Sequence, residues 1–230
     1  MGLGRWMLRA FGGRLSELEE ARRLQDQASR LNLPFEVEFA GKPVLFREIE
    51  AADADRVLRF ARALPEHDLL FLRRDITQRD GVAAWLADVA EGKYSSIVAL
   101  AGEELVGYAT VAQDGMTWTR HVGELRILVA PAMRGMGLGS LLVQQAFAIA
   151  TARGIRKLVA QMTVDQEGAI KGFDRLGFSQ EAVLKRHVMD REGALHDLQI
   201  MALDVAEFDS QLTRERLTVV ASSESLANSL

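Results

Sequence analysis

The chain has no cysteine, no long apolar run and no excess of basic residues. Without cysteine it has no disulfide, no thiol nucleophile and no thiolate ligand for a metal, and we expect no metal ion. The absence of cysteine is also compatible with the cytoplasmic location that we expect. No apolar run reaches the roughly 18 to 20 residues of a membrane-spanning helix, so no membrane span is predicted.

Charge limits the partners that the chain can have. The formal net charge is −4 and the isoelectric point is near 5.7, which is not the charge of a nucleic-acid-binding surface. We therefore expect no nucleic-acid partner. The first residues, MGLGRWMLRAFGGR, combine arginines with Trp6, Leu8 and Phe11 and contain no acid. They suit an anionic membrane surface or, as we prefer, a terminus that frays or packs on a partner.

The length and composition favour one large domain with an extension. The chain has 230 residues, of which 48% are apolar, enough for a sizeable core. Ser16 and Glu19 have the spacing of a capping box, so we expect a helix from there to Leu31. We divide the chain into an N-terminal helical extension at 1–40, a main domain at 41–209 and a flexible tail at 210–230. The extension either packs on the main domain or makes a homodimer contact.

Apolar periodicity predicts the order of elements in the main domain. Strands and helices alternate in a pattern that indicates an α/β or α+β fold. A short helix begins after Asp165, which caps it, and ends at Gly177, while Gly154 caps the long helix before it. The expected strands are 44–49, 94–101, 104–113, 121–130, 157–164, 182–190 and 195–203, and the other helices are 51–64, 78–90 and 138–153.

The chain is organised around residues 124–139, which read ELRILVAPAMRGMGLG. An apolar strand stops at Pro131, a glycine-rich turn follows, and the long helix begins at once. Successive glycines allow backbone N–H groups to point into one small volume, and a helix N-terminus adds partial positive charge. A phosphate, or better a pyrophosphate, fits such a turn.

Two common phosphate motifs fit this turn badly. A Walker loop ends in Gly-Lys-Ser/Thr, whereas Gly139 is followed by Ser140 and Leu141, without a lysine. A dinucleotide fingerprint has a third glycine at its sixth position, which is Ser140 when counted from Gly135. A nucleotide-binding domain is therefore not the preferred interpretation.

The third alternative is a family resemblance. Residues 134–139, Arg-Gly-Met-Gly-Leu-Gly, match the Arg/Gln-x-x-Gly-x-Gly/Ala signature of the GNAT acyltransferase superfamily, whose members bind the pyrophosphate of acetyl-CoA in this turn. The later segment AIKGFDRLGF resembles the family's Ala-x-x-x-Tyr-x-x-x-Gly-Phe ending, and Gly107-Tyr108 resembles its Val-Gly-aromatic-Ala strand. The resemblance spans about Val44 to Leu203.

The resemblance implies a fold and an activity. The fold would be the GNAT fold, a central, mixed and mostly antiparallel sheet of six to seven strands flanked by about four helices. The activity would be acetyl transfer from acetyl-CoA to a primary amine by direct attack in a ternary complex. The acceptor would be a small-molecule or peptide amine, which the sequence does not identify because family members share the donor site and differ in the acceptor groove.

The resemblance also implies residues for the cofactor. In the family two parallel strands splay apart and the pantetheine arm lies between them, which corresponds here to 123–129 and 157–163. The N–H of Leu128 would then stabilise the oxyanion, and Asp165 and Phe173 would line the cofactor. Backbone contacts to pantetheine would come from Ile127 and Val129, and contacts to pyrophosphate from Arg134, Gly135, Met136, Gly137, Leu138, Gly139 and Ser140.

An alkylammonium must lose a proton before it attacks, so the site needs a base. Glu124 lies where several family members carry a glutamate base, but it could equally be a strand carboxylate paired with Arg126. His187, His196 and Asp197 on the last two strands are further candidates for the acceptor side. Residues 67–74 would form one wall of the groove, and Arg73 and Arg74 would suit a carboxylate or phosphate on the acceptor.

Two positions depart from the family pattern. Phe173 stands where many members have the tyrosine that protonates the leaving thiolate, and phenylalanine has no proton to donate. Asp165 replaces the family's asparagine in the loop before. Three alternatives follow: the thiolate leaves unaided or through water, another group donates the proton, or the chain binds acyl-CoA without turnover as a regulatory sensor.

Overall fold

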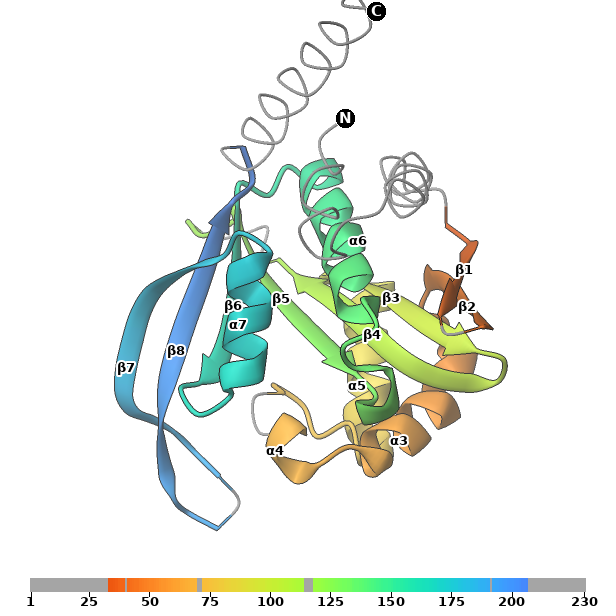
Figure 1. Cartoon of the computed structure of the whole chain (residues 1–230), viewed down its shortest axis with the longest axis horizontal. Helices are drawn as coiled ribbons and strands as arrows, with labels where there is room; N and C mark the ends of the chain where they lie inside the picture. The colour runs from red at the N-terminus through yellow and green to blue at the C-terminus, as the bar shows by residue number, and fades with distance from the viewer. Residues whose placement is uncertain (1–32, 40, 70–71, 114–117, 191, 207–230) are drawn as a thin grey trace, which may run out of the picture.

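The computed structural model describes residues 33–39, 41–69, 72–113, 118–190 and 192–206. This part forms one eight-stranded sheet in the order β1-β2-β3-β4-β5-β6-β8-β7, with helices on both faces (Figure 1). All neighbouring strands are antiparallel except β5 and β6. The strands are β1 (Phe35–Phe39), β2 (Lys42–Glu48), β3 (Tyr94–Ala101), β4 (Glu104–Ala112), β5 (Val122–Val129), β6 (Lys157–Thr163), β7 (Ser179–Met189) and β8 (Leu195–Asp204). The helices are α3 (Ala54–Ala63), α4 (Glu66–Leu69), α5 (Arg79–Ala90), α6 (Leu138–Ala152) and α7 (Glu167–Arg175).

The predicted fold class is confirmed, with more strands than expected. The sequence did not predict β1, whose five residues follow Pro34 and alternate between buried and exposed positions. It is held by β2, and the ring of Phe35 stacks on that of Phe46 with centroids 5.0 Å apart. One cap was also predicted wrongly, because the N-cap of α7 is Gln166 and not Asp165.

Two apolar layers hold the sheet. On one face α6 packs against β4 and β5. Gly107 lets this helix approach closely, since a Cβ on it would lie 3.1 Å from Leu142 Cδ1 and 3.3 Å from Leu138 Cδ2. On the other face α3 and α5 pack against β3 and β4, where Trp85 and Phe60 contact the ring of Tyr108.

The parallel pair of strands separates soon after it begins. Strands β5 and β6 pair only at Val122–Lys157, Gly123–Leu158 and Glu124–Val159. Beyond these pairs β5 remains bonded to β4, and β6 remains bonded to β8. A V-shaped gap therefore opens toward the C-terminal ends of β5 and β6, and α6 begins beside it (Figure 1).

A buried ion cluster holds α3 to the sheet. Asp53 is 1% exposed and accepts hydrogen bonds from Arg47 Nη1 at 2.6 Å, Arg47 Nη2 at 2.7 Å, Arg56 Nη1 at 3.2 Å and the Glu50 N–H at 2.9 Å. Burial alone would raise the pKa of the Asp53 carboxyl, but these donors, above all Arg47, hold that pKa below its usual value. The ionised form is therefore the one that the fold stabilises.

We expect Asp53→Ala to lower the free energy of unfolding by about 2 to 4 kcal/mol, because it leaves the charge of Arg47 without its buried partner. The depressed pKa contributes stability above the unfolded pKa of about 4, and that contribution is lost as the pH falls through the lower folded pKa. Urea unfolding at neutral and at acidic pH should show the difference between wild type and variant shrinking in acid. A difference that stays constant with pH would contradict the ionic origin of the effect.

No described helix is both long and apolar enough to cross a membrane. The predicted helix at 16–31 and the tail at 210–230 lie outside the described residues, as do the first residues with their arginines. The division of the chain at residues 40 and 209 therefore stays a prediction.

Candidate functional site

The glycine turn has the backbone geometry of an anion site. Gly135 and Gly137 have φ angles of 76° and 90°, which L-residues with side chains rarely adopt. Gly137 is the N-cap of α6, and the first bond inside the helix runs from Leu141 N to Gly137 O. The N–H groups of residues 138–140 therefore have no acceptor within the helix and lie at its positive end. Together these features suit a bound phosphate group.

The gap exposes backbone groups of β5. The Ala130 N–H donates to Val106 O on β4 at 2.9 Å, and the Leu128 carbonyl also faces β4, 3.1 Å from the Cβ position of Gly107. Because successive peptide groups of a strand point to opposite edges, the Ile127 carbonyl and the Val129 N–H and carbonyl face the gap. The Leu128 N–H, which the sequence predicts as the oxyanion donor, faces β4 by the same alternation, whereas the Val129 N–H faces the gap.

Helix α4 lies at the open end of the gap and contacts both of its sides (Figure 1). His67 Nε2 lies 3.3 Å from Asp165 Oδ2 after β6, and Gln166 Nε2 donates to the His67 carbonyl at 3.4 Å. On the other side Asp68 pairs with Arg134 of the glycine turn. The guanidinium of Arg134 also donates through Nε to the Val129 carbonyl at 3.2 Å.

The carboxylate of Glu124 is 13% exposed and has guanidinium partners on both oxygens. Its Oε1 accepts from Arg126 Nε at 3.0 Å and from Arg126 Nη2, and its Oε2 accepts from Arg73. Arg73 is on the segment between α4 and α5, so this pair ties the predicted groove wall to β5. The pairing with Arg126 that the sequence left open is present.

His196 shares a face of the sheet with Glu124. Glu124, Val159 and Ala202 are successive partners across β5, β6 and β8, and His196 is an even number of residues from Ala202, so its side chain is on the same side. Its Nε2 lies 2.7 Å from Asp190 Oδ2. This partner raises the pKa of His196 and in turn lowers the pKa of Asp190.

The remaining candidates have different surroundings. Asp165 is half exposed, and its pKa is lowered first by the Thr163 hydroxyl and further by His67 and His196. Phe173 is partly buried, with its ring 5.0 Å from that of Phe178. His187 is exposed on β7, and Asp197 is held by Lys185 and the Arg186 N–H.

Sequence reasoning missed several polar residues of this region. No sequence pattern marked Gln166, Asp190 or Asp88, because each of them interacts with a partner that is distant in the sequence or lies across a hairpin. Among the described residues no group of three or more histidines or acids could hold a metal ion.

The fold and the site define an α/β protein with splayed parallel strands and a glycine turn at a helix N-terminus whose backbone geometry suits an anion. The sequence model of the Acetyltransferase (GNAT) family matches residues 57–178, more than half of the chain. The chain belongs to this family of acetyltransferases.

Individual relatives match over shorter stretches. An uncharacterised N-acetyltransferase of Methanocaldococcus jannaschii is 39% identical over 67 residues, which are 29% of this chain and 30% of that protein. N-alpha-acetyltransferase 30 of Schizosaccharomyces pombe is 29% identical over 96 residues, 41% of this chain and 64% of that protein. The matched part is thus less than two thirds of either relative.

A solved structure shows the same fold. YncA from Salmonella typhimurium, whose structure holds its cofactor acetyl-CoA, superposes with a TM-score of 0.60 at 23% identity. The superposition covers 70% of this chain and 94% of that one. At this identity the likeness concerns the fold alone.

Proposed function

We propose that the chain transfers an acetyl group from acetyl-CoA to a primary amine. The observation that carries the proposal is the V-shaped gap between β5 and β6, which leads to the glycine turn at the start of α6. A long ligand with an acyl group at one end and a pyrophosphate farther along matches this combination. YncA, which has the same fold, holds acetyl-CoA.

Different residues beside the gap would bind different parts of acetyl-CoA. Ile127 and Val129 offer backbone groups to the pantetheine amides, and residues 134–140 offer N–H groups and the Arg134 guanidinium to the pyrophosphate. Acetyl-CoA supplies an activated thioester carbonyl. The Val129 N–H would donate to the oxygen of that carbonyl as it becomes negative during attack by the amine.

Proton transfer is the step for which the side chains matter most. The acceptor ammonium gives a proton to Glu124, the neutral amine forms the N–C bond, and the C–S bond breaks to release the thiolate. The attacking nitrogen, which becomes positive, passes its second proton to the thiolate or to water, and the amide is neutral. Glu124 can accept this proton only when one of its two arginine partners is displaced. Phe173 supplies no acid, so the thiolate leaves without a proton from this position.

A sensor that binds acyl-CoA without turnover remains the second candidate. It is favoured by Phe173 and by the arginines that occupy both oxygens of Glu124. The two functions share the donor site and differ only in chemistry.

The experiment that separates them has two parts. Calorimetric titration with acetyl-CoA tests the donor site, and release of free thiol in the presence of primary amines tests transfer. Binding without thiol release for any amine would favour the sensor. Absence of binding would overturn both candidates. The cytoplasmic location and the homodimer stay predictions from the sequence.

Asp68 would compete with the pyrophosphate of acetyl-CoA for the guanidinium of Arg134. Its carboxylate is paired with the guanidinium that we assign to the pyrophosphate, and 18% of its side chain is exposed. Partly exposed ion pairs contribute up to about 1 kcal/mol, so we expect Asp68→Asn to tighten acetyl-CoA binding by about two- to fivefold. Calorimetry checks this, with Asp80→Asn, an exposed acid on α5, as the control of equal charge. Weaker binding by Asp68→Asn than by the control would show that Asp68 supports the site.

A further inference from the structure

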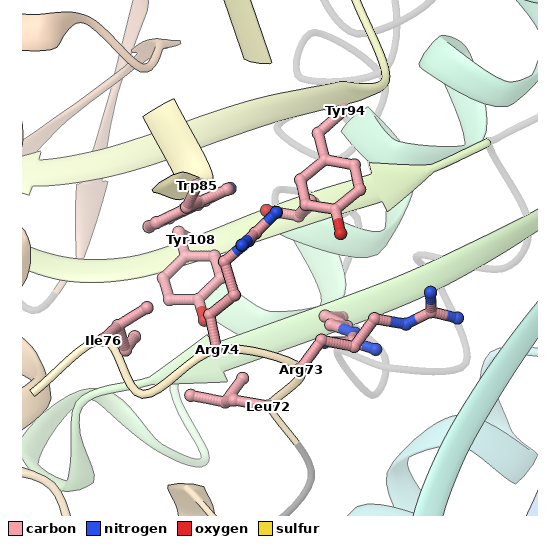
Figure 2. A pocket seen from close by; sticks show the side chains of 9 residues that line it. Leu72, Arg73, Arg74, Ile76, Trp85, Tyr94 and Tyr108 are labelled. Carbon is pink, nitrogen blue, oxygen red and sulfur yellow. The ribbon is translucent and has the colours of Figure 1, made fainter. Parts of the chain in front are cut away.

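A small pocket beside Glu124 is lined by donors. Its volume is about 30 Å³, which is room for a small polar group. Figure 2 shows Arg74 extending beside Tyr108 toward Trp85 and Tyr94, while Arg73 points away from them. No aspartate or glutamate is among the lining residues, which are Leu72, Arg73, Arg74, Ile76, Trp85, Tyr94, Tyr108, Thr110 and Arg126.

The arginines of the pocket carry more charge than their partners neutralise. Arg73 and Arg126 share the single carboxylate of Glu124, and Arg74 pairs with Asp88. Three guanidiniums thus face two carboxylates. The Nε of Arg74 is buried and has no hydrogen-bond partner. A buried donor without a partner is costly, and Arg74 is one of the residues that line the pocket. The pocket therefore combines an under-bonded arginine with an excess positive charge.

The floor of the pocket is rigid and uncharged. Trp85 Nε1 donates to Ser96 Oγ at 3.3 Å, and Ser96 Oγ lies 2.9 Å from Thr110 Oγ1. Tyr108 is 3% exposed. Burial raises the pKa of its hydroxyl, so the group stays protonated and can only donate to an anion or accept from an arginine.

The pocket lies next to the proposed reaction centre. Arg126 is two residues after Glu124 on β5, on the same face of the strand, about 7 Å along it. On the basis of the proposed acetyl transfer, we propose that this pocket binds a carboxylate of the acceptor. The acceptor is then an amino acid whose carboxylate lies close to the reacting amine. A carboxylate carries one negative charge, which matches the single excess charge of the three lining arginines.

This assignment also explains how Glu124 becomes available. When the acceptor carboxylate takes hydrogen bonds from Arg126 and Arg74, it replaces Glu124 as the anion of Arg126, while Arg74 keeps its pair with Asp88. One oxygen of Glu124 then loses its guanidinium and faces the acceptor ammonium. The proton passes from that ammonium to Glu124, the amine nitrogen bonds to the acetyl carbon, and the sulfur leaves with the electron pair of the C–S bond. The acylated nitrogen then loses its second proton to the thiolate or to water, which gives the neutral amide. Binding of the right acceptor thus prepares the base.

The test compares L-amino acids with their carboxamides, which keep the amine and side chain and lack only the charge. With acetyl-CoA in excess, thiol release should give at least one amino acid a kcat/KM about 30-fold above that of its amide, because the site is built to bond the missing group. The amine of the carboxamide is less basic than that of the amino acid, so a larger fraction of it is unprotonated at a given pH. This difference favours the carboxamide, so it cannot itself produce the expected preference for the amino acid. Stabilisation of the acetyl-CoA complex against heat by the same amino acid gives a second readout.

Variants locate the effect. Arg126→Gln should reduce the preference for the acid over the amide to about threefold or less, mainly through KM, while Arg59→Gln, an exposed arginine on α3, should leave it intact. Thermal unfolding confirms that both variants fold, and Arg74→Lys, which keeps a cation beside Asp88, should give an intermediate preference. Equal use of amides, or no response to any amino acid, would overturn the proposal. Since acetyl-CoA binding is measured separately, such a result would leave the donor site standing.

Discussion

Gly137→Asp should abolish measurable binding of acetyl-CoA while leaving the fold intact. The new carboxylate would lie at the N-cap of α6, where the pyrophosphate is expected. Two like charges about 4 Å apart near a protein surface cost about 4 kcal/mol, so a loss of affinity of about 100-fold or more is expected. Calorimetric titration checks it, and thiol release should fall in parallel at low acetyl-CoA concentration.

The matched control is Gly137→Asn, which has the same shape as the aspartate without its charge. Asparagine and aspartate adopt left-handed backbone only occasionally, so both variants are strained at the φ of 90° that Gly137 adopts, and by similar amounts. We expect the asparagine variant to bind within about tenfold of wild type, and the two variants to unfold at similar temperatures. An equal loss in both would mean that the turn excludes any side chain for lack of space. Normal binding by the aspartate variant would place the anion elsewhere.

The glycine turn and the strand and helix beside it could be predicted from the sequence because their signals are local. Gly135 and Gly137 are separated only by Met136 and fix the turn by themselves, and the apolar runs on either side give the strand and the helix. The separation of β5 from β6 is different. It depends on where pairing stops, after Glu124 and Val159, and only the family resemblance indicated it.

The acceptor half depends on contacts between distant segments, which periodicity does not reveal. Arg74 meets Asp88 from α5, Asp68 meets Arg134 from the glycine turn, and His196 meets Asp190 across a hairpin. Each pair forms because the tertiary fold places two short segments together. The sequence marked Arg73 and Arg74 as cations near a groove, but it could not show that both line one pocket with Arg126.

The missed strand has a similar cause. Residues 35–39 are too few and too close to Pro34 to give a clear signal by themselves. They form a strand because β2 offers an edge and because Phe46 offers a ring for Phe35. Strand propensity of this kind depends on the surrounding packing, which the local sequence does not contain.

Glu124→Gln is expected to lower kcat by about 100- to 10,000-fold with little change in acetyl-CoA affinity, since a general base contributes a factor of this size. Glutamine keeps the length of the side chain and an oxygen that can accept from Arg126 or Arg73, but it cannot take a proton. The measurements are thiol release at saturating acceptor and calorimetric titration of the donor.

The pH dependence of the variant separates the base from a structural carboxylate. Without Glu124 only the unprotonated acceptor can react, so the rate of the variant should rise about tenfold per pH unit below the amine pKa of about 8 to 10. The difference in rate between variant and wild type should therefore become smaller as the pH increases. If Glu124 only holds Arg73 and Arg126 in place, the variant should instead unfold at a lower temperature, because two guanidiniums lose their shared anion, and its rate should keep the pH profile of the wild type. The ion pairs and the proposed proton transfer involve the same two oxygens of Glu124. The carboxylate would therefore act first as the partner of the arginines. It would act as the base only after the acceptor carboxylate has taken over the hydrogen bonds of Arg126.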